Sequence, residues 1–506
     1  MVSGREGGGY TAAQPVGHTS GVANGKSWTR GLSLPPGEIV DAAPNVRNLN
    51  ATRLPHARPR SSSSPVRPVE GNTAAPVHRG PWSQASLTMF ATVALVSGLV
   101  ATAAPPSPTG HPSGLAQRAY VWQRAWTPAL RRALAESGPA FAALDVLAAE
   151  VTWQDSVPST HRIQPDWPAL QATQRAVGVV VRVGPCSGRW ADGSAEVRAV
   201  IEACRASLAD ARSRGVEPAE LQLDFDAPTA RLAEYRSLLH AVRREVAPPR
   251  LVITALPDWL RSPAFTALVE LTDCFVLQVH SLEKPDDIRQ PYTVCDPVRA
   301  LRWIAQAEKL RRPYRIALPA YGYRLAFDAA GKFAGLTAEG PALTWPAGYR
   351  ERLVLADTTA LAALVKLLVA APPTACEGIA WFRLPTDEDE LAWSWPTLRA
   401  VMGGTPPEAR LALRAEPTSD RSFDLSEINQ GTAGAEPAPF LVQWHDARLV
   451  AADAIAGWQY ERRGSGALVI RPPKFGTNGI LRPGGAIAVG WLRFDGPATL
   501  TLAPAQ

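Results

Sequence analysis

The chain has 506 residues, 46% of them hydrophobic, so it can bury a large core and is expected to hold more than one domain. Its formal net charge of +6 is concentrated in residues 1–86, which carry nine Lys and Arg residues against four Asp and Glu residues. The rest of the chain is therefore close to neutral and offers no basic stripe to a phosphate backbone, which argues against a nucleic-acid partner.

The N-terminal region has two parts. Residues 1–86 are rich in Gly, Pro, Ser and Arg and have no periodic apolar face, which predicts a disordered tail. An uncharged apolar run at 87–104 follows Arg79 and ends in small residues, a pattern typical of a secretory signal peptide. A membrane anchor is the alternative, since the run is just long enough to span a bilayer. Because signal peptides normally begin a chain, we hypothesise that translation starts near Val77.

Both interpretations of 87–104 predict an exported protein, periplasmic or extracellular, with the membrane as a partner only through this segment. The five cysteines have no spacing typical of a metal site, and their odd number leaves at least one unpaired. The eight histidines are scattered. We therefore expect no structural metal and no cofactor.

After a linker at 105–116, strand-like and helix-like segments alternate. Strands are predicted at 119–126, 142–153, 177–183, 221–226, 251–256, 275–281, 315–323 and 378–384. Helices are predicted at 128–136, 195–214, 230–246, 263–271, 297–310 and 358–370. This rhythm predicts an α/β fold, a (β/α)8 TIM-type barrel over 117–403. A doubly wound open sheet is the alternative, but no Gly-rich phosphate loop follows the first strand.

A polar linker is expected at 404–436, followed by a β-rich accessory module at 437–506. Short alternating segments separated by Gly and Pro predict a small all-β sandwich there, with strands at 440–444, 457–462, 467–471, 486–494 and 499–502. Trp444, Trp458 and Trp491 could face a ligand, although core packing is the expected use of a Trp in so small a module.

The fourth predicted strand of the barrel carries two carboxylates. Side chains alternate along a strand, so Gln222, Asp224 and Asp226 share one face, while Leu223 and Phe225 share the other. Two carboxylates this close raise each other's pKa, which is useful for proton transfer and costly as scaffolding. We therefore predict Asp224 and Asp226 as catalytic residues. The alternative is a pair that only hydrogen-bonds neighbouring strands or loops.

The other strands add polar and aromatic side chains at their carboxyl ends, where a barrel's active site lies. Glu150 is the third catalytic candidate. The predicted substrate-binding residues are Trp122, Arg124, Arg182, Gln278, His280, Tyr321, Tyr323, Trp381 and Arg383. Each has a structural explanation when taken singly. Together, carboxylates, a His, Tyr hydroxyls and flat Trp faces suit a sugar, which presents apolar ring faces and a fringe of hydroxyls.

Three motifs carry a resemblance to a known family. Leu223-Asp224-Phe225-Asp226, Leu318-Pro319-Ala320-Tyr321-Gly322 and Ile379-Ala380-Trp381 resemble motifs of chitinase-type, family-18 glycoside hydrolases. Residues 117–403 resemble more closely the bacterial family known as domain of unknown function 3142, whose members resemble barrel relatives of those hydrolases.

The resemblance implies a barrel that acts on a glycan, with Asp226 orienting a substrate acetamido group or sharing a proton with Asp224. The family's general acid is a Glu at the position of Pro228, and the first Asp of its longer motif is replaced by Leu221. Pro cannot donate a proton, so the family's substrate-assisted mechanism does not carry over intact.

Two functions follow as hypotheses, both with a carbohydrate polymer of the cell envelope or an exopolysaccharide as the partner. The first is a glycoside hydrolase that uses Asp226 and Glu150, with Asp224 balancing their charge, since glycoside cleavage needs one protonated and one ionised carboxyl. The second is a catalytically inactive carbohydrate-binding protein. A divalent-cation site at the two aspartates is a third interpretation, which lacks a third ligand.

Overall fold

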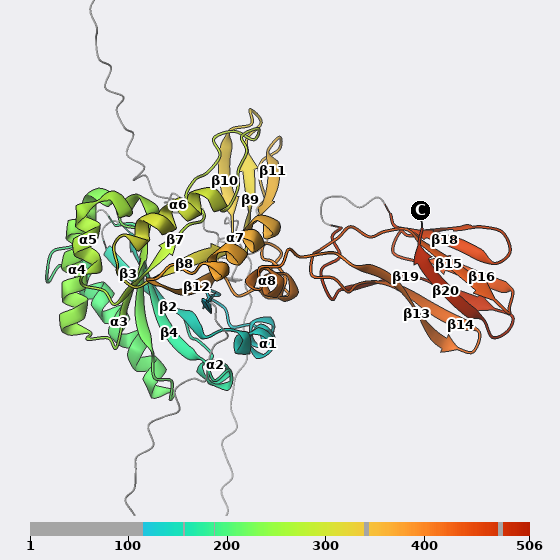
Figure 1. The fold of residues 1–506 in the computed structure, drawn as a ribbon, viewed down its shortest axis with the longest axis horizontal. Coiled ribbons are helices and arrows are strands. Elements are labelled where there is room, and N and C mark those ends of the chain that lie inside the picture. The colour runs from blue at the N-terminus through green and yellow to red at the C-terminus, as the bar shows by residue number, and fades with distance from the viewer. Residues whose placement is uncertain (1–114, 155–156, 187, 339–343, 474–478, 506) are drawn as a thin grey trace, which may run out of the picture. The chain divides into compact units, whose positions relative to one another are not determined.

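The structure is a computed structural model that describes residues 115–154, 157–186, 188–338, 344–473 and 479–505 (Figure 1). The predicted tail and the apolar segment at 87–104 lie outside these residues. Within the described ranges, no helix combines the length and the hydropathy needed to cross a membrane.

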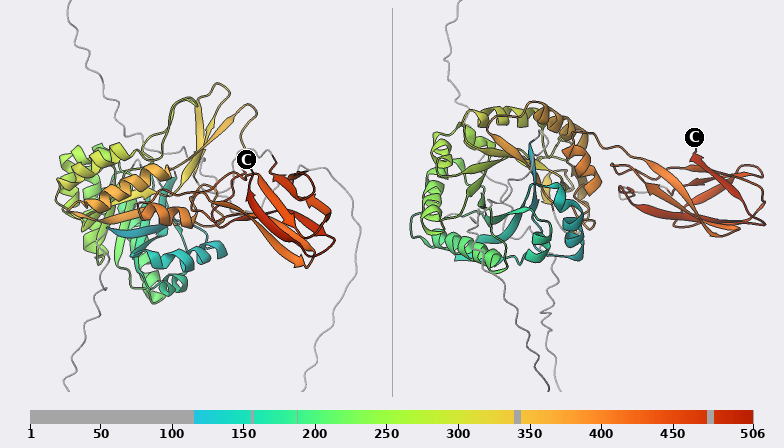
Figure 2. Two further views of the ribbon diagram at one scale, coloured as in Figure 1. Left: turned by 45° about the vertical axis from the view of Figure 1, so that its right-hand side comes forward. Right: turned by 60° about the horizontal axis from the view of Figure 1, so that its bottom comes forward.

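Eight parallel strands form a closed barrel. They are β1 (Ala116–Val121), β2 (Ala143–Gln154), β4 (Ala176–Val183), β5 (Glu220–Phe225), β6 (Leu251–Ala255), β7 (Cys274–Gln278), β8 (Tyr314–Pro319) and β12 (Cys376–Phe382). Strand β1 pairs with both β2 and β12, and this double pairing closes the sheet. Figure 2 shows the resulting ring of strands with helices around it. The predicted (β/α)8 barrel is thus confirmed, and the open-sheet alternative is wrong.

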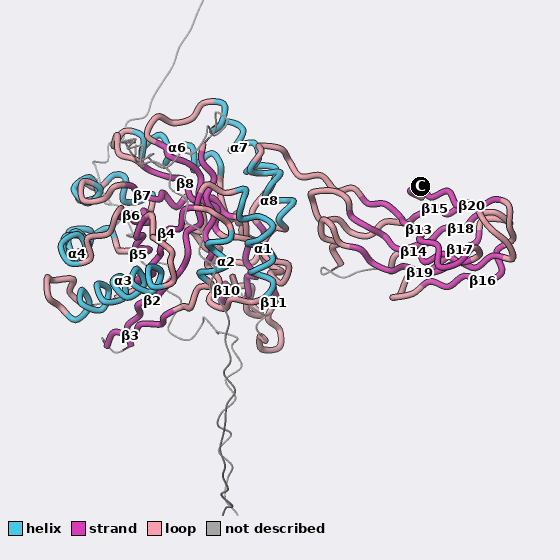
Figure 3. The backbone as a smooth tube through the Cα atoms, turned by 90° about the horizontal axis from the view of Figure 1, so that it is seen from below, coloured by secondary structure: helices cyan, strands magenta, loops and turns pink. Residues whose placement is uncertain are grey.

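Helices cover the outside of the barrel (Figure 3). They are α1 (Pro128–Ser137), α2 (Trp167–Ala172), α3 (Ala195–Ser213), α4 (Leu232–Glu245), α5 (Pro263–Val269), α6 (Pro297–Glu308), α7 (Thr358–Ala370) and α8 (Trp395–Met402). Three short 3-10 turns accompany them, namely η1 (Gly138–Ala140), η2 (Thr229–Arg231) and η3 (Pro257–Arg261). Side-chain caps mark several starts: Ser194 accepts the Val197 N–H before α3, and Asp357 accepts the Ala360 N–H before α7. Helices α2 and α8, of six and eight residues, were not predicted.

Strand alternation sorts the core into two parts. Outward-facing residues such as Leu221, Leu223 and Phe225 pack under the helices. Inward-facing residues of the strands belong to a separate cluster inside the barrel, which also includes Ile163. Its other members are Tyr120, Trp122, Leu147, Val180, Val252, Cys274, Val276, Ala317 and Ala380, with Trp126 and Phe382 packed against it. The two faces of β5 therefore have the environments that its alternating sequence predicts.

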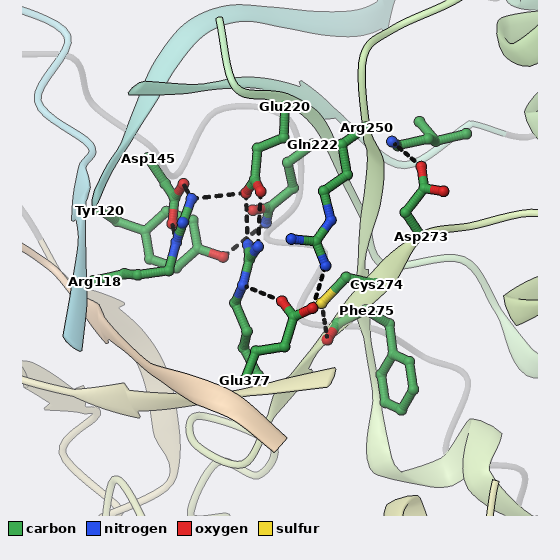
Figure 4. A network of polar contacts seen from close by, with 12 residues as sticks. Arg118, Tyr120, Asp145, Glu220, Gln222, Arg250, Asp273, Cys274, Phe275 and Glu377 are labelled. Atoms are coloured by element: carbon green, nitrogen blue, oxygen red, sulfur yellow. Dashed lines mark hydrogen bonds and ion pairs between the residues drawn. The ribbon is translucent and has the colours of Figure 1, made fainter. Parts of the chain in front are cut away.

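A buried ion network lies at the amino-terminal ends of the barrel strands (Figure 4). Arg315 donates to both oxygens of Glu220, at 2.5 and 2.7 Å, and Arg118 donates to Glu220 at 2.8 Å and to Asp145 at 3.0 Å. Burial would raise the pKa of Glu220, but the hydrogen bonds of Arg315 and the charges of Arg118, Arg315 and Arg250 outweigh it and lower that pKa. A Cβ at Gly178 would come within 2.4 Å of Asp145 Oδ1, so glycine leaves room for this network. It fills this end of the barrel with paired charges.

Two additions to the barrel were not predicted. Strand β3 (Val157–Arg162) folds back antiparallel on β2. Between β8 and α7, the strands β9 (Gly322–Phe327), β10 (Phe333–Thr337) and β11 (Arg350–Leu355) form a three-stranded antiparallel sheet. The single strand expected at 315–323 is accordingly two strands, β8 and β9, separated by Ala320 and Tyr321.

The C-terminal region is an all-β module of two four-stranded antiparallel sheets. Its strands are β13 (Leu411–Ser419), β14 (Ser422–Asn429), β15 (Phe440–His445), β16 (Leu449–Ala454), β17 (Gln459–Arg462), β18 (Ala467–Arg471), β19 (Ala486–Phe494) and β20 (Thr499–Pro504). The sheets run β13-β14-β19-β16 and β17-β18-β15-β20 and share one apolar core, which confirms the predicted sandwich-like module. Strands β13 and β14 lie within 404–436, where a linker was expected. In β14 the alternation of apolar and polar residues is interrupted by a register shift between Leu425 and Ser426, after which the buried positions are the polar residues Glu427 and Asn429.

Candidate functional site

The acidic strand β5 places its two aspartates at the carboxyl end of the barrel. Glu220 and Gln222 precede Asp224 on the same face and contact residues inside the barrel, so Asp224 also faces inward. Gln222 donates to Tyr120 Oη at 2.7 Å and to Thr254 Oγ1 at 3.1 Å, and the side chain of Thr254 hydrogen-bonds Asp224. Asp226 follows directly after the strand.

Both aspartates have a raised pKa. Burial is the largest cause for Asp224, opposed by the positive charge of Arg182 and by the Thr254 hydrogen bond. For Asp226, desolvation by the surrounding protein and then the charge of Asp224 raise the pKa to about 7. Asp226 is nevertheless an exposed residue, and solvent screening reduces the size of this pKa shift without changing its direction. Asp226 is therefore easier to protonate than an ordinary Asp, and its exposed side chain can exchange a proton with solvent.

Glu150 has the opposite electrostatic environment. It lies on β2, and Arg124 binds both of its oxygens, with Nε at 2.6 Å from Oε2 and Nη2 at 2.9 Å from Oε1. Burial would raise the pKa of Glu150, but the hydrogen bonds and charge of Arg124, together with Arg182, outweigh it and lower that pKa. Glu150 is therefore an ionised, fixed carboxylate and a poor proton donor.

Arg182, on β4, joins these acids into one cluster. Its guanidinium lies 3.8 Å from Glu150 Oε1 and 4.0 Å from Asp224 Oδ2, and its carbon Cζ lies 5.9 Å from the centroid of the Trp122 ring. The structure thus brings together five predicted site residues, Trp122, Arg124, Glu150, Arg182 and Asp224, and Asp226 is coupled to them through Asp224 and Arg182.

A second polar group lies at the ends of β7 and β8. His280 Nδ1 is 3.3 Å from Ser281 Oγ and 3.5 Å from Tyr321 Oη, while Tyr321 Oη is 2.9 Å from Tyr323 Oη. Burial lowers the pKa of His280 to about 3, so its ring is neutral at physiological pH. Gln278 donates to the His280 carbonyl at 3.2 Å. These four predicted residues lie together, and Ser281, which the sequence analysis did not select, links two of them.

The aromatic residue Phe382, at the end of β12, connects the two polar groups. Its ring centroid lies 5.0 Å from that of Trp122, 5.3 Å from that of Tyr321 and 5.8 Å from that of His280. Phe382 was not among the residues predicted from the sequence, although Ala380 and Phe382 share a face by strand alternation.

The residue of β12 that was predicted to bind substrate is Trp381, not Phe382. The structure does not bring the Trp381 side chain to the site. This side chain is fully buried among outward-facing core residues, and its Nε1 donates to Gln117 Oε1 at 2.6 Å. A shift of one residue along a strand moves a side chain to the other face of the sheet, which accounts for this correction.

Arg383 is the other predicted residue that lies elsewhere. It is buried and pairs with Asp389, with Nε at 3.1 Å from Oδ2. Its Nη2 is 3.4 Å from the Ala338 carbonyl oxygen, so Arg383 joins two loop segments. These contacts hold the two loop segments together, and Arg383 is not among the binding residues that we propose. Among the described residues, no cluster of three His, Cys, Asp or Glu side chains is arranged to hold a metal ion.

Residues 174–387 match the protein family described as a domain of unknown function (DUF3142), which confirms the resemblance noted from the sequence for this part of the barrel. A comparison with curated proteins finds no match.

Solved structures similar to this chain include glycoside hydrolases of low sequence identity. A chitinase from Chromobacterium violaceum is 15% identical with a TM-score of 0.40, over 57% of this chain and 98% of that one. The spore cortex-lytic enzyme SleL of Bacillus cereus is 13% identical with a TM-score of 0.41, over 59% and 76%. The GH18 chitinase ChiB of Flavobacterium johnsoniae is 10% identical with a TM-score of 0.37, over 54% and 89%.

Proposed function

We propose that this protein is a glycoside hydrolase that cleaves a carbohydrate polymer by carboxylate acid/base chemistry at the carboxyl end of its barrel. The observation that carries the proposal is the contrast between Asp226, whose pKa is raised to about 7, and Glu150, whose pKa is lowered. When the surroundings raise the pKa of one carboxyl group and lower the pKa of another in the same site, the first can act as a proton donor and the second as a fixed anion.

In this mechanism Asp226 is the general acid and gives its proton to the leaving glycosidic oxygen as the bond from that oxygen to the anomeric carbon breaks. A water molecule then forms the new bond to the anomeric carbon, and its proton passes to the Asp226 carboxylate, which restores the acid. Glu150, fixed by Arg124, supplies the negative charge that stabilises the positive charge developing at the anomeric carbon. Asp224 shares the proton of Asp226, and Arg182 balances the remaining charge. Because Asp226 supplies the proton, the mechanism does not need the Glu that the family-18 motif has at the position of Pro228.

The sugar would lie against the partly exposed ring of Phe382, which packs on the buried ring of Trp122. The hydroxyls of Tyr321 and Tyr323 and the neutral ring of His280 offer hydrogen bonds to sugar hydroxyls. Gln278 belongs to the same group of binding residues, because its side chain donates a hydrogen bond to the His280 carbonyl oxygen. We also propose that the protein is exported, on the basis of the apolar segment at 87–104.

The test is a pair of variants, Asp226→Asn and Glu150→Gln, assayed separately and together for binding and hydrolysis of a glycan panel that includes chitin, peptidoglycan and neutral exopolysaccharides. We expect each variant to lose hydrolysis by about 100-fold or more while retaining glycan binding. Glu136→Gln, on the outer helix α1, is the matched control and should behave like the wild type. Unchanged hydrolysis in the Asp226→Asn variant would refute the proposed acid.

A carbohydrate-binding protein without catalysis is the second candidate. The observation in its favour is that Arg124 occupies both oxygens of Glu150, which leaves this carboxylate poorly placed to attack a sugar or activate water. In that case the wild type would bind a glycan of the panel and hydrolyse none, and the two variants would change only the affinity.

A further inference from the structure

The three tryptophans of the C-terminal module have different environments. Trp444 and Trp458 are 4% and 3% exposed and belong to the core between the two sheets. Trp491 is 37% exposed, and its neighbours along β19 are core residues that face the other way, such as Leu492 at 1% exposure. Trp491 therefore stands on the outer face of its sheet and contributes little to the core.

The position of Trp491 within the sheet is central. Strand β19 lies between β14 and β16, so Trp491 has a directly paired residue on each side, Asp424 on β14 and Asp453 on β16. Directly paired residues of antiparallel strands share a face, which places both carboxylates beside the indole. Both aspartates are exposed. The ring is thus flanked by hydrogen-bond acceptors on both sides.

The next outward position along β19 is Arg493, whose paired neighbours are Ser422 and Ala451. Their side chains are short, so they do not cover the indole. Within the described part of the chain, Asp424, Asp453 and Arg493 form no ion pair, and Trp491 makes no contact with another aromatic ring. Two acceptors and one donor group around an uncovered aromatic ring are therefore available to a ligand.

We propose that Trp491, Asp424, Asp453 and Arg493 form a second carbohydrate-binding site, on the C-terminal module, for a neutral polysaccharide. The aromatic ring would stack on the apolar face of a sugar, and the carboxylates and the guanidinium would bind its hydroxyls. Two carboxylates beside the ring repel phosphate groups, which argues against a nucleic acid or an anionic lipid surface. The choice of ligand rests on the function proposed for the barrel, but the site itself does not involve the barrel residues.

The test measures how much of the full-length protein is retained on insoluble chitin and on microcrystalline cellulose. We expect Trp491→Ala to lower the partition coefficient on at least one of them about tenfold, the size of the loss of one good aromatic contact. Asp424→Asn combined with Asp453→Asn should weaken retention severalfold, and Trp491→Tyr should preserve most of it. Tyr460→Ala is the matched control, because Tyr460 is similarly exposed, at 39%, on β17 of the other sheet.

Two further measurements separate this inference from the function proposed for the barrel. Asp226→Asn should keep the retention, and Trp491→Ala should keep the hydrolysis of short soluble glycosides while losing activity on the insoluble polymer. The inference is overturned if the wild type is retained on neither polymer, or if Trp491→Ala is retained as well as the wild type. It is also overturned if Trp491→Ala changes only the oligomeric state, which would assign this surface to a second copy of the chain. Thermal unfolding of each variant checks that the module remains folded.

Discussion

At the scale of single residues, carboxyl groups of similar intrinsic acidity acquire different properties from their neighbours. Glu150 has two hydrogen bonds from Arg124, whereas the pKa of Asp226 is raised by desolvation and by the negative charge of Asp224, which the charge of Arg182 offsets only in part. At neutral pH Glu150 is therefore ionised, whereas Asp226 is protonated more readily than Glu150. This difference is what allows one cluster to provide both a proton and a fixed negative charge.

The raised pKa of Asp226 predicts the pH dependence of the proposed hydrolysis. A general acid must be protonated, so activity should fall as the pH rises through about 7, where Asp226 loses its proton. Removing the neighbouring charge by Asp224→Asn should move this alkaline limb to lower pH, because the repulsion that favours the protonated form is gone. Initial rates between pH 4 and 9 measure both effects. An alkaline limb that Asp224→Asn leaves in place would contradict the coupling.

A buried acid in the C-terminal module predicts a pH-dependent stability. Glu427 is fully buried on β14; its Oε1 accepts the Ala438 N–H at 2.9 Å, and its Oε2 has no partner among the described residues. Burial raises the pKa of Glu427, opposed by the Ala438 hydrogen bond, so the folded module holds this proton to higher pH than the unfolded chain does. The free energy of unfolding should therefore decrease as the pH rises from the ordinary Glu range through the raised pKa.

Glu427→Gln should remove this dependence, because an amide does not ionise. We expect the variant to be about 1 kcal/mol more stable than the wild type at pH 8 and similar at pH 4. Denaturant unfolding at the two pH values measures the difference. Glu416→Gln, at an exposed position of β13, is the control and should change neither value.

At the scale of secondary-structure elements, β12 separates structural from functional roles by alternation. Trp381 packs outward into the core, whereas Phe382 faces Trp122 and Tyr321 on the inner side. Trp381→Ala should therefore destabilise the barrel by about 3–5 kcal/mol, as expected for a large core side chain. Phe382→Leu should retain most of the stability and weaken glycan binding. Thermal unfolding and a binding isotherm for each variant give the comparison, and a reversed pattern would show that the faces are misassigned.

The ion network at the amino-terminal end of the barrel is a property of several strands. It connects β1, β2, β5 and β8 through Arg118, Asp145, Glu220 and Arg315. Arg315→Ala would leave Glu220 buried with one cationic partner fewer, and we expect a loss of about 3–5 kcal/mol. Arg289→Ala, at an exposed position, is the control. Chemical denaturation measures both, and a loss below about 1 kcal/mol for Arg315→Ala would contradict the structural role of the network.

At the scale of the whole molecule, the described chain has separate apolar cores for the barrel and for the C-terminal module. Each core is large enough to unfold as a cooperative unit. We therefore expect two transitions in differential scanning calorimetry. Glu427→Gln should shift only one of them and Arg315→Ala only the other. A single transition that both variants shift together would contradict this independence.

The sequence by itself determined the barrel and much of the proposed site. The eight-fold alternation of strands and helices and the faces of β5 follow from periods of two and 3.6 residues, which are local properties of the chain. Active sites of such barrels lie at the carboxyl ends of the strands. This rule identified most of the residues that the structure brings together.

The tertiary structure alone decided which charges pair and which ring faces inward. Arg124 and Glu150 are 26 residues apart, and Arg315 and Glu220 are 95 apart, so no local pattern reveals these pairs. The register of β12 places Phe382, and not the predicted Trp381, on the inner face. The short strands β3 and β9–β11 are insertions into the barrel. Both features are set by contacts between distant segments of the chain. Periodicity assigns a residue to a face, but only the folded chain sets the neighbours that determine its pKa and its role.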